Sequence, residues 1–340
     1  MLRKIQILIV ITVFLALNVY AGDTDRIGTA GGVQVLQPVG AKGIALGGSN
    51  IASTQNVDAI FWNPAGLAKL DRPAEGHFST MNIFNDIRIN YFAFGFNMAE
   101  LGVLGASVKF FDFGDIPLTT NQDEDGESGR TFSPTFATIG LTYAINLTDR
   151  ISVGLNSKVI LEEVPRASAS TIAFDIGLQY SNFADIEGIS FGLAIKNIGA
   201  DLQYSGSGLT DQYSTAGGRL DYLSRDAASN DLPSSFEIGV GYEYSVNEEN
   251  SITASTMFQS NNFSNDIVKF GAEYNFQDFV MLRGGYNYIN DINTEDQLYD
   301  FTLGGGIKYD LGGTLFQLDY AFRNDQYFDA NNVFSVTLGF

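Results

Sequence analysis

The sequence predicts an all-β protein: a 14-stranded antiparallel transmembrane β-barrel with an N-terminal helical plug or hatch. Three observations predict this fold. Apolar residues alternate with polar or small ones through most of the chain from residue 75 onward, and two is the period of a strand. The alternating segments are even in number, and their connections differ systematically in length, as in bacterial outer-membrane barrels. The chain also ends on an alternating segment with a terminal aromatic residue, Phe340.

The composition excludes several kinds of site. The 340 residues include no cysteine and one histidine, His77, which excludes disulfides and thiolate metal sites and argues against a histidine-based metal site or triad. Lys and Arg number 19 and Asp and Glu 39, giving a net charge of −20, which argues against nucleic-acid binding. We therefore expect no metal, no cofactor, no nucleic acid and no enzymatic activity.

The first 21 residues have the features of a secretory signal peptide. Arg3 and Lys4 precede a mostly apolar run over residues 5–17, and Val19 and Ala21 are small residues at the cleavage-determining positions. The run is shorter than the ~20 residues of a spanning helix. We expect export and removal of residues 1–21, leaving a plug or hatch segment, 22–73, and an outer-membrane barrel, 74–340.

Residues 22–73 do not alternate and are rich in glycine. Asn63 followed by Pro64 predicts a helix start, because the amide side chain caps free N–H groups and proline at the first helical position loses no hydrogen bond. Short helices and tight turns are expected here. A packed N-terminal arm and a plug in the barrel lumen are compatible interpretations, and the plug is favoured. The predicted plug motif is Trp62, Asn63, Pro64, Ala65 and Gly66.

The predicted strands place their apolar positions on one face, as Phe236, Ile238 and Val240 show. A membrane barrel turns this face to lipid, whereas a soluble sandwich buries it. The period does not distinguish the two, so a soluble all-β protein is the alternative. The fourteen strands are expected at residues 75–82, 87–98, 102–113, 132–147, 150–163, 169–181, 188–198, 233–246, 250–260, 265–276, 278–289, 298–310, 313–323 and 332–340.

The connections favour the membrane barrel. Short ones fall at 99–101, 147–150, 277–278 and 310–313, and long or polar ones at 114–131, 199–231, 290–297 and 324–331. The two sets lie at opposite ends if both termini are periplasmic, which is the outer-membrane pattern of short inner turns and longer outer loops.

The face opposite the lipid face carries charges of both signs. These charges pair with each other and with a plug if the lumen is filled, or meet water if it is open, and the sequence does not decide between the two. The charged residues are Lys158, Asp175, Lys196, Glu237, Glu243, Lys269, Glu273, Arg283, Lys308, Asp310, Asp319 and Arg323.

Two patterns fall short of ligand motifs. Residues 121–126, Asn-Gln-Asp-Glu-Asp-Gly, match the first half of a calcium loop, but position twelve is Phe132 where a bidentate glutamate belongs. A solvated acidic loop is the better interpretation. The glycines of residues 31–48 do not follow a strand, so they predict no nucleotide site.

Residues 40–68 carry a family resemblance. Gly-Ala-Lys-Gly-Ile-Ala-Leu-Gly-Gly-Ser-Asn-Ile-Ala and, from Asp58, Asp-Ala-Ile-Phe-Trp-Asn-Pro-Ala-Gly-Leu-Ala resemble the N-terminal signature of the PorV/PorQ family. The Asn-Pro-Ala core is also similar to the FadL-like fatty-acid transporters. The resemblance implies an outer-membrane barrel of Bacteroidetes-type bacteria. The best-known members of this family serve type IX secretion, in which they receive a cargo protein by the C-terminal domain of that cargo. The terminal aromatic strand likewise resembles the signal that directs barrel insertion.

Two functions of different kinds follow. A non-enzymatic component of type IX secretion would bind secreted proteins with a C-terminal secretion domain, or the translocon, through outer loops 114–131 and 199–231. A FadL-like channel would instead hold a hydrophobic small molecule against Phe61 and Trp62. For Trp62 an aromatic anchor that packs the N-terminal arm is favoured over a ligand contact, because aromatic residues dominate packing. Either protein would be surrounded by outer-membrane lipid.

Overall fold

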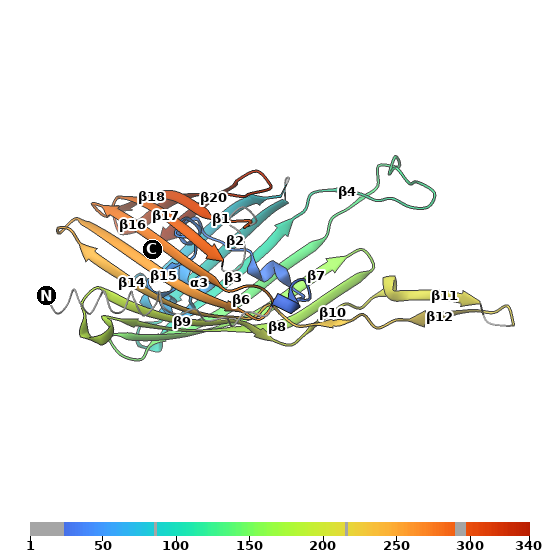
Figure 1. The fold of residues 1–340 in the computed structure, drawn as a ribbon, viewed down its shortest axis with the longest axis horizontal. Helices are drawn as coiled ribbons and strands as arrows, with labels where there is room; N and C mark the ends of the chain where they lie inside the picture. The colour runs from blue at the N-terminus through green and yellow to red at the C-terminus, as the bar shows by residue number, and fades with distance from the viewer. Residues whose placement is uncertain (1–23, 85–86, 215–216, 290–296) are drawn as a thin grey trace.

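In the computed structural model, which describes residues 24–84, 87–214, 217–289 and 297–340, fourteen strands form a closed antiparallel barrel (Figure 1). All fourteen predicted strands are present, which confirms the predicted fold class. They are β1 Ala74–Ile83, β2 Ile87–Asn97, β3 Val103–Asp112, β6 Thr135–Asn146, β7 Ile151–Val164, β8 Ala167–Ser181, β9 Ile189–Gly199, β14 Ser235–Ser245, β15 Asn250–Asn261, β16 Ile267–Phe276, β17 Val280–Ile289, β18 Phe301–Leu311, β19 Thr314–Arg323 and β20 Asn331–Gly339.

The last strand closes the barrel. β20 pairs with β1 from Glu75 opposite Gly339 to Met81 opposite Val333. The Phe340 N–H donates to the Ala74 carbonyl at 2.8 Å, so the pairing extends to the final residue. Both edges of the sheet are therefore paired, and no open strand edge faces lipid.

The apolar face of the strands points outward. On β20, Phe334 is 56% and Val336 37% exposed, while Ser335 and Thr337 are buried. On β8, Ile172 and Ile176 are exposed and Asp175 is buried. A soluble sandwich would show the reverse, so this sidedness removes the alternative that the period left open.

Short and long connections lie at opposite ends, as predicted. Two of the long loops also form small ladders: β4 Ile116–Pro117 pairs with β5 Thr131–Phe132, β10 Leu202–Gln203 with β13 Ser229–Asn230, and β11 Thr210–Ser214 with β12 Leu220–Ser224. Three connections at the long-loop end are short: residues 84–86 between β1 and β2, a two-residue turn at Pro165 and Arg166 between β7 and β8, and residues 262–266 between β15 and β16. The predicted loop at 290–297 lies, except for Gln297, outside the described residues.

Two strand starts were predicted three residues too early. β6 begins at Thr135, not at residue 132, and β18 begins at Phe301, not at residue 298. Tyr299 precedes it, and its ring stacks on the guanidinium of the buried Arg323, 3.7 Å from the ring centroid. Tyr299 follows the period of the strand in sequence, but this stacking takes it out of the ladder.

Residues 24–73 pass through the lumen, and we call them the hatch. Gly31 N–H donates to the Asp231 carbonyl at the long-loop end (2.9 Å), and Asn146 Nδ2 donates to the Ala68 carbonyl at the short-turn end (2.9 Å). None of the helices in the described part of the chain is both long and apolar enough to span a bilayer. The hatch elements are η1 Thr24–Arg26, η2 Val33–Leu36, α2 Ala41–Ala45, η3 Asn50–Ala52, η4 Asn56–Asp58, α3 Ala59–Trp62 and η5 Pro64–Lys69.

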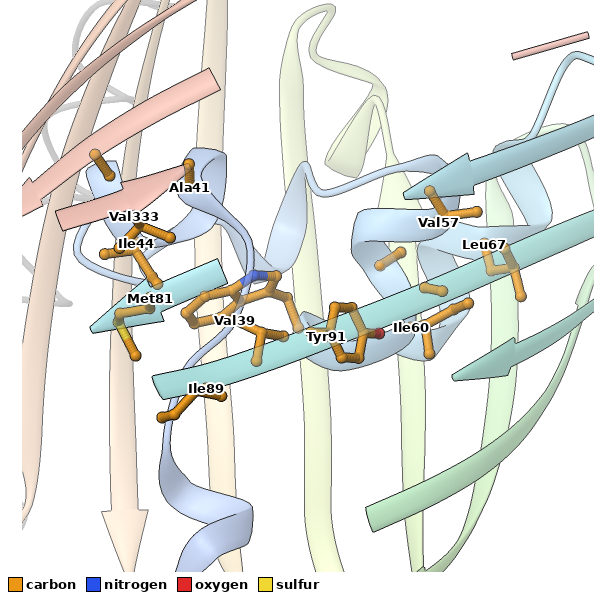
Figure 2. Packing of buried hydrophobic residues seen from close by; sticks show 14 of the residues in the cluster. Val39, Ala41, Ile44, Val57, Ile60, Leu67, Met81, Ile89, Tyr91 and Val333 are labelled. Carbon is orange, nitrogen blue, oxygen red and sulfur yellow. The ribbon is translucent and has the colours of Figure 1, made fainter. Parts of the chain in front are cut away.

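The main apolar core lies between the hatch and one wall of the barrel (Figure 2). Val39 and Ile44 of the hatch pack with Met81, Ile89 and Val333 of the strands. Full burial of each such side chain contributes about 1.5–3 kcal/mol. The hatch is therefore held partly by ordinary hydrophobic packing on the β1, β2 and β20 side.

Elsewhere side-chain and backbone atoms of the hatch lie directly against glycines of the strands. A Cβ built on Gly177 would lie 2.1 Å from Asn63 Oδ1, and one on Gly154 would lie 2.3 Å from the Pro64 carbonyl carbon. Distances this short leave no room for any side chain. Among the described strands, ten glycines on ten different strands come within 3.0 Å of a hatch atom in this way, and we call them the glycine ring: Gly95, Gly105, Gly154, Gly177, Gly192, Gly239, Gly271, Gly285, Gly304 and Gly339.

Replacing a glycine of this ring by a residue with a side chain should displace the hatch from the barrel wall. We expect Gly177→Val to lower the thermal unfolding midpoint of the detergent-solubilised protein, because overpacking costs about 1–3 kcal/mol or more, and to expose the hatch to limited proteolysis. Gly284→Val is the matched control, because a Cβ there meets only Leu303 Cδ2 at 3.6 Å and the Thr302 carbonyl at 3.9 Å. Equal stability and protease resistance in the two variants would contradict the close seating described here.

Candidate functional site

Asn63 is the point at which the plug motif meets the barrel. Its backbone is extended (φ −157°), and η5 starts at Pro64 directly after it. Asn63 Oδ1 accepts from the Ala65 N–H at 3.2 Å, the cap that the sequence predicts. Its Nδ2 donates to the carbonyls of Ile51 (2.8 Å) and Leu178 (3.1 Å). One side chain therefore caps a hatch helix and ties it to β8.

The rest of the motif packs around this point. Ala65 and Gly66 are buried, and a Cβ on Gly66 would lie 2.2 Å from the Thr54 carbonyl oxygen. Pro64 lies against Gly154 of β7. These residues bring two turns of the hatch into contact with each other and with two strands.

Trp62 is only 6% exposed and lies inside the hatch. Cβ atoms on Gly43 and Gly48 would lie 2.2 and 2.7 Å from its indole, so two hatch glycines make room for the ring. Phe61 meets it edge-on, with 5.0 Å between ring centroids. The environment of Trp62 is that of a packing anchor.

Phe61 is half-buried and lines a small cavity, which we call the Phe61 cavity. Its volume is about 40 Å³. A single water needs ~10–15 Å³ on this measure, whereas an apolar cavity known to hold benzene measures ~150 Å³. As it stands, the Phe61 cavity admits a few water-sized particles and no hydrocarbon.

Charged side chains of the lumen pair across strands. Lys158 contacts Asp175 at 2.7 Å, and Lys196 contacts Glu237 at 3.0 Å. Arg283 bridges Glu273 and Asp319. The prediction of a charged inner face is confirmed for these residues, and their charges are paired with one another within the lumen. Such pairing offsets the cost of burying ions.

Polar cavities lie at the short-turn end of the hatch. Two of them, of about 260 and 180 Å³, share Lys42, Gln55, Glu273 and Asn275 in their walls. Lys69 of η5 lines the larger one and donates to Ser181 Oγ at 3.1 Å. Burial lowers the pKa of this lysine. Charged walls of this kind suit water and ions, and an apolar solute leaving the hatch would have to cross them.

The β11–β12 hairpin extends beyond the barrel at the long-loop end (Figure 1). Its exposed apolar side chains include Tyr222 (67%), Leu220 and Leu223. In the strands of the barrel such side chains face lipid, but the hairpin projects past them. Exposed apolar surface away from lipid is typical of a protein contact site.

The calcium-like pattern in loop 114–131 has a structural role. Asp123 accepts from the backbone N–H groups of Glu127 (2.8 Å) and Ser128 (3.0 Å). The pKa of Asp123 is lowered most by a hydrogen bond from the Ser128 side chain, and next by one from the Ser128 backbone. The carboxylate therefore caps its own loop. Within the described residues no cluster of three or more histidine, cysteine or acidic side chains is arranged to hold a metal.

Sequence reasoning missed the glycine ring. Gly177, Gly192, Gly239 and Gly271 occupy the non-lipid face of four of the alternating segments, where glycine is disfavoured unless another part of the protein approaches closely. That pattern was the available signal for a segment packed against the inner wall.

The fold is shared with outer-membrane channels of known structure. The CymD monoaromatic hydrocarbon channel matches with a TM-score of 0.54 and 13% identity, over 89% of this chain and 97% of that one. The Pseudomonas putida toluene transporter TodX matches with a TM-score of 0.52 and 12% identity, over 86% of this chain and 96% of that one. The Ralstonia pickettii toluene transporter TbuX matches with a TM-score of 0.52 and 15% identity, over 88% of this chain and 98% of that one. Identities this low show a common fold alone. No curated protein matches the sequence.

The sequence itself identifies a family. Residues 21–263 match the family described as type IX secretion system protein PorV. The match takes in the hatch and more than half of the chain, and the barrel fold and the family both indicate the outer membrane. The chain belongs to the PorV family.

Proposed function

We propose that this protein is a non-enzymatic component of type IX protein secretion that binds cargo or the translocon through outer loops 114–131 and 199–231. The observation that carries the proposal is the projecting β11–β12 hairpin, whose apolar side chains have no lipid to contact. A lumen filled by the hatch is compatible with this role, because binding on the outer loops needs no passage through the barrel.

We also propose that residues 1–21 are a cleaved signal peptide and that residues 22–73 and 74–340 act as hatch and barrel. Within the hatch, Trp62, Asn63, Pro64, Ala65 and Gly66 would serve as its anchor. The contacts of Asn63 with β8 and the burial of Trp62 support this role. N-terminal sequencing of the protein from outer membranes, expected to start at residue 22, tests the cleavage.

The hairpin surface gives the direct test of the secretion role. We expect Tyr222→Ser combined with Leu223→Ser to reduce capture of cargo or translocon proteins by the tagged protein by about tenfold, since buried aromatic anchors dominate interfaces. Capture from detergent-solubilised outer membranes with mass spectrometry measures this. The control, Gln212→Ser with Asp221→Ser, changes exposed polar residues of the same hairpin. Unchanged capture by the apolar variant would remove the hairpin from the proposed interface.

The alternative is a channel for hydrophobic molecules held against Phe61 and Trp62. The shared fold with hydrocarbon channels motivates it, while the small Phe61 cavity and the charged walls beyond the hatch argue against it. Under our proposal, cells with wild-type protein take up labelled toluene or fatty acid no faster than cells without it.

A substitution at Trp62 separates the two functions. We expect Trp62→Ala to destabilise the protein by about 3–5 kcal/mol, as loss of a large buried aromatic does, without lowering uptake of a hydrophobic solute. Phe94→Ala, which removes an exposed ring from the barrel exterior, is the control. Wild-type uptake that falls on Trp62→Ala but not on Phe94→Ala would favour the channel.

A further inference from the structure

The Phe61 cavity has an excess of positive charge. Lys109, Lys158 and Lys196 all line it. Asp175 pairs with Lys158 and Glu237 with Lys196. Within the described chain, Lys109 has no carboxylate at ion-pair distance. Its Nζ donates to the carbonyls of Val35 (3.3 Å) and Gln37 (3.0 Å) and lies 5.1 Å from the centroid of the Phe61 ring. These contacts stabilise an ammonium but do not neutralise it.

Hydrogen-bond donors lie beside Lys109 in a row across three strands. Tyr91 of β2 is directly opposite Lys109 of β3, and Lys109 is opposite Thr138 of β6. All three side chains are buried and line the Phe61 cavity. Directly opposed residues have Cβ atoms ~4.5–5.5 Å apart, so two hydroxyls and an ammonium face one small space.

The hydroxyl protons of this row are unused. Among the described residues, Thr138 Oγ1 has no hydrogen-bond partner, and the Tyr91 hydroxyl has no acceptor for its own proton, although the Ser107 hydroxyl interacts with the Tyr91 oxygen. A buried hydroxyl without a partner destabilises the folded protein. Both groups are able to donate, and they lie next to the one lysine of the cavity that lacks a carboxylate.

The volume and the charge together restrict the occupant. At about 40 Å³ the cavity holds no more than a few water-sized particles, and Val35, Ile60 and Phe61 line it with apolar surface. Water would satisfy the hydroxyls but would supply no counter-charge, and a lysine buried without a counter-charge gives up its proton. A small anion satisfies the hydroxyls and keeps Lys109 as an ammonium.

We propose that the Phe61 cavity binds one small monovalent anion of the halide class, held by Lys109 Nζ and the hydroxyls of Thr138 and Tyr91. The site is separate from the outer loops and does not depend on the secretion role. Its occupant would join the hatch, through Val35, Gln37 and Phe61, to the wall of β2, β3 and β6.

The anomalous scattering of bromide can locate the site in the unmodified protein. Crystals of the full-length mature protein grown with bromide in place of chloride should show one anomalous peak between Lys109 and Thr138. In detergent at constant ionic strength, the unfolding midpoint should rise with chloride and level off relative to gluconate, as a one-site ligand predicts. No bromide peak together with a halide-independent midpoint would mean that the cavity holds water only, which overturns the proposal.

Two variants test the named ligands. Thr138→Val keeps the shape and removes the hydroxyl, and we expect it to weaken the apparent chloride affinity about tenfold, because hydrogen bonds to charged groups contribute most. Lys109→Met should abolish the chloride effect, and Lys42→Met, outside this cavity, is the control. If Lys109→Met does not fold, Thr138→Val and the bromide peak still decide. Chloride dependence that survives both substitutions would show that these residues do not form the site.

Discussion

The close approach of the hatch to the glycine ring is the contact on which the rest of the structure depends. Ten strands carry glycine where they meet the hatch, so side-chain and backbone atoms of the hatch lie directly against the backbone of the strands. The hatch therefore fills the lumen with short, irregular helices whose polar groups need partners. Asn63 and Gln179 supply some of them, donating to the hatch carbonyls of Ile51 and Thr54. Irregular backbone is tolerated at membrane depth only when it is enclosed by protein in this way.

This arrangement divides the molecule by function. The lumen is occupied by packing, ion pairs and hydrogen bonds, which leaves the surfaces beyond the barrel for recognition. The shared fold with hydrocarbon channels shows that the same architecture can be adapted for passage. Here, in the described part of the chain, the cavity at Phe61 is small and the cavities beyond the hatch have charged walls.

Much of the fold could be predicted from the sequence because it depends on local periodicity. The alternation of Phe334, Val336 and Leu338 with Ser335 and Thr337 predicts both the strand and its two faces. Whether the apolar face points outward or inward could not be predicted from the period, because sandwiches and membrane barrels share a period of two. The closed barrel shows that it points outward. Tyr299 fitted the period but left the ladder, because the charge of Arg323, distant in sequence, attracts its ring.

The candidate site was less predictable for the same reason. Asn63 and Pro64 predict a cap, and the cap is present. Two other features depend on strand register. One is the contact of Asn63 with Gly177, and the other is the row formed by Tyr91, Lys109 and Thr138. Register is set by pairing across the whole barrel, and no short stretch of sequence contains it.

The order of elements along the chain also has a mechanical consequence. The hatch ends at η5 and, after residues 70–73, continues directly into β1, the strand that pairs with β20 to close the barrel. A force applied to the end of the hatch is therefore passed along the chain to β1 and to its pairing with β2 and β20. Arg72, just before β1, is held at the β18–β19 turn by donating to the Gly313 carbonyl at 2.9 Å and pairing with Asp310. Pulling on the end of the hatch therefore also loads the strand that closes the barrel wall.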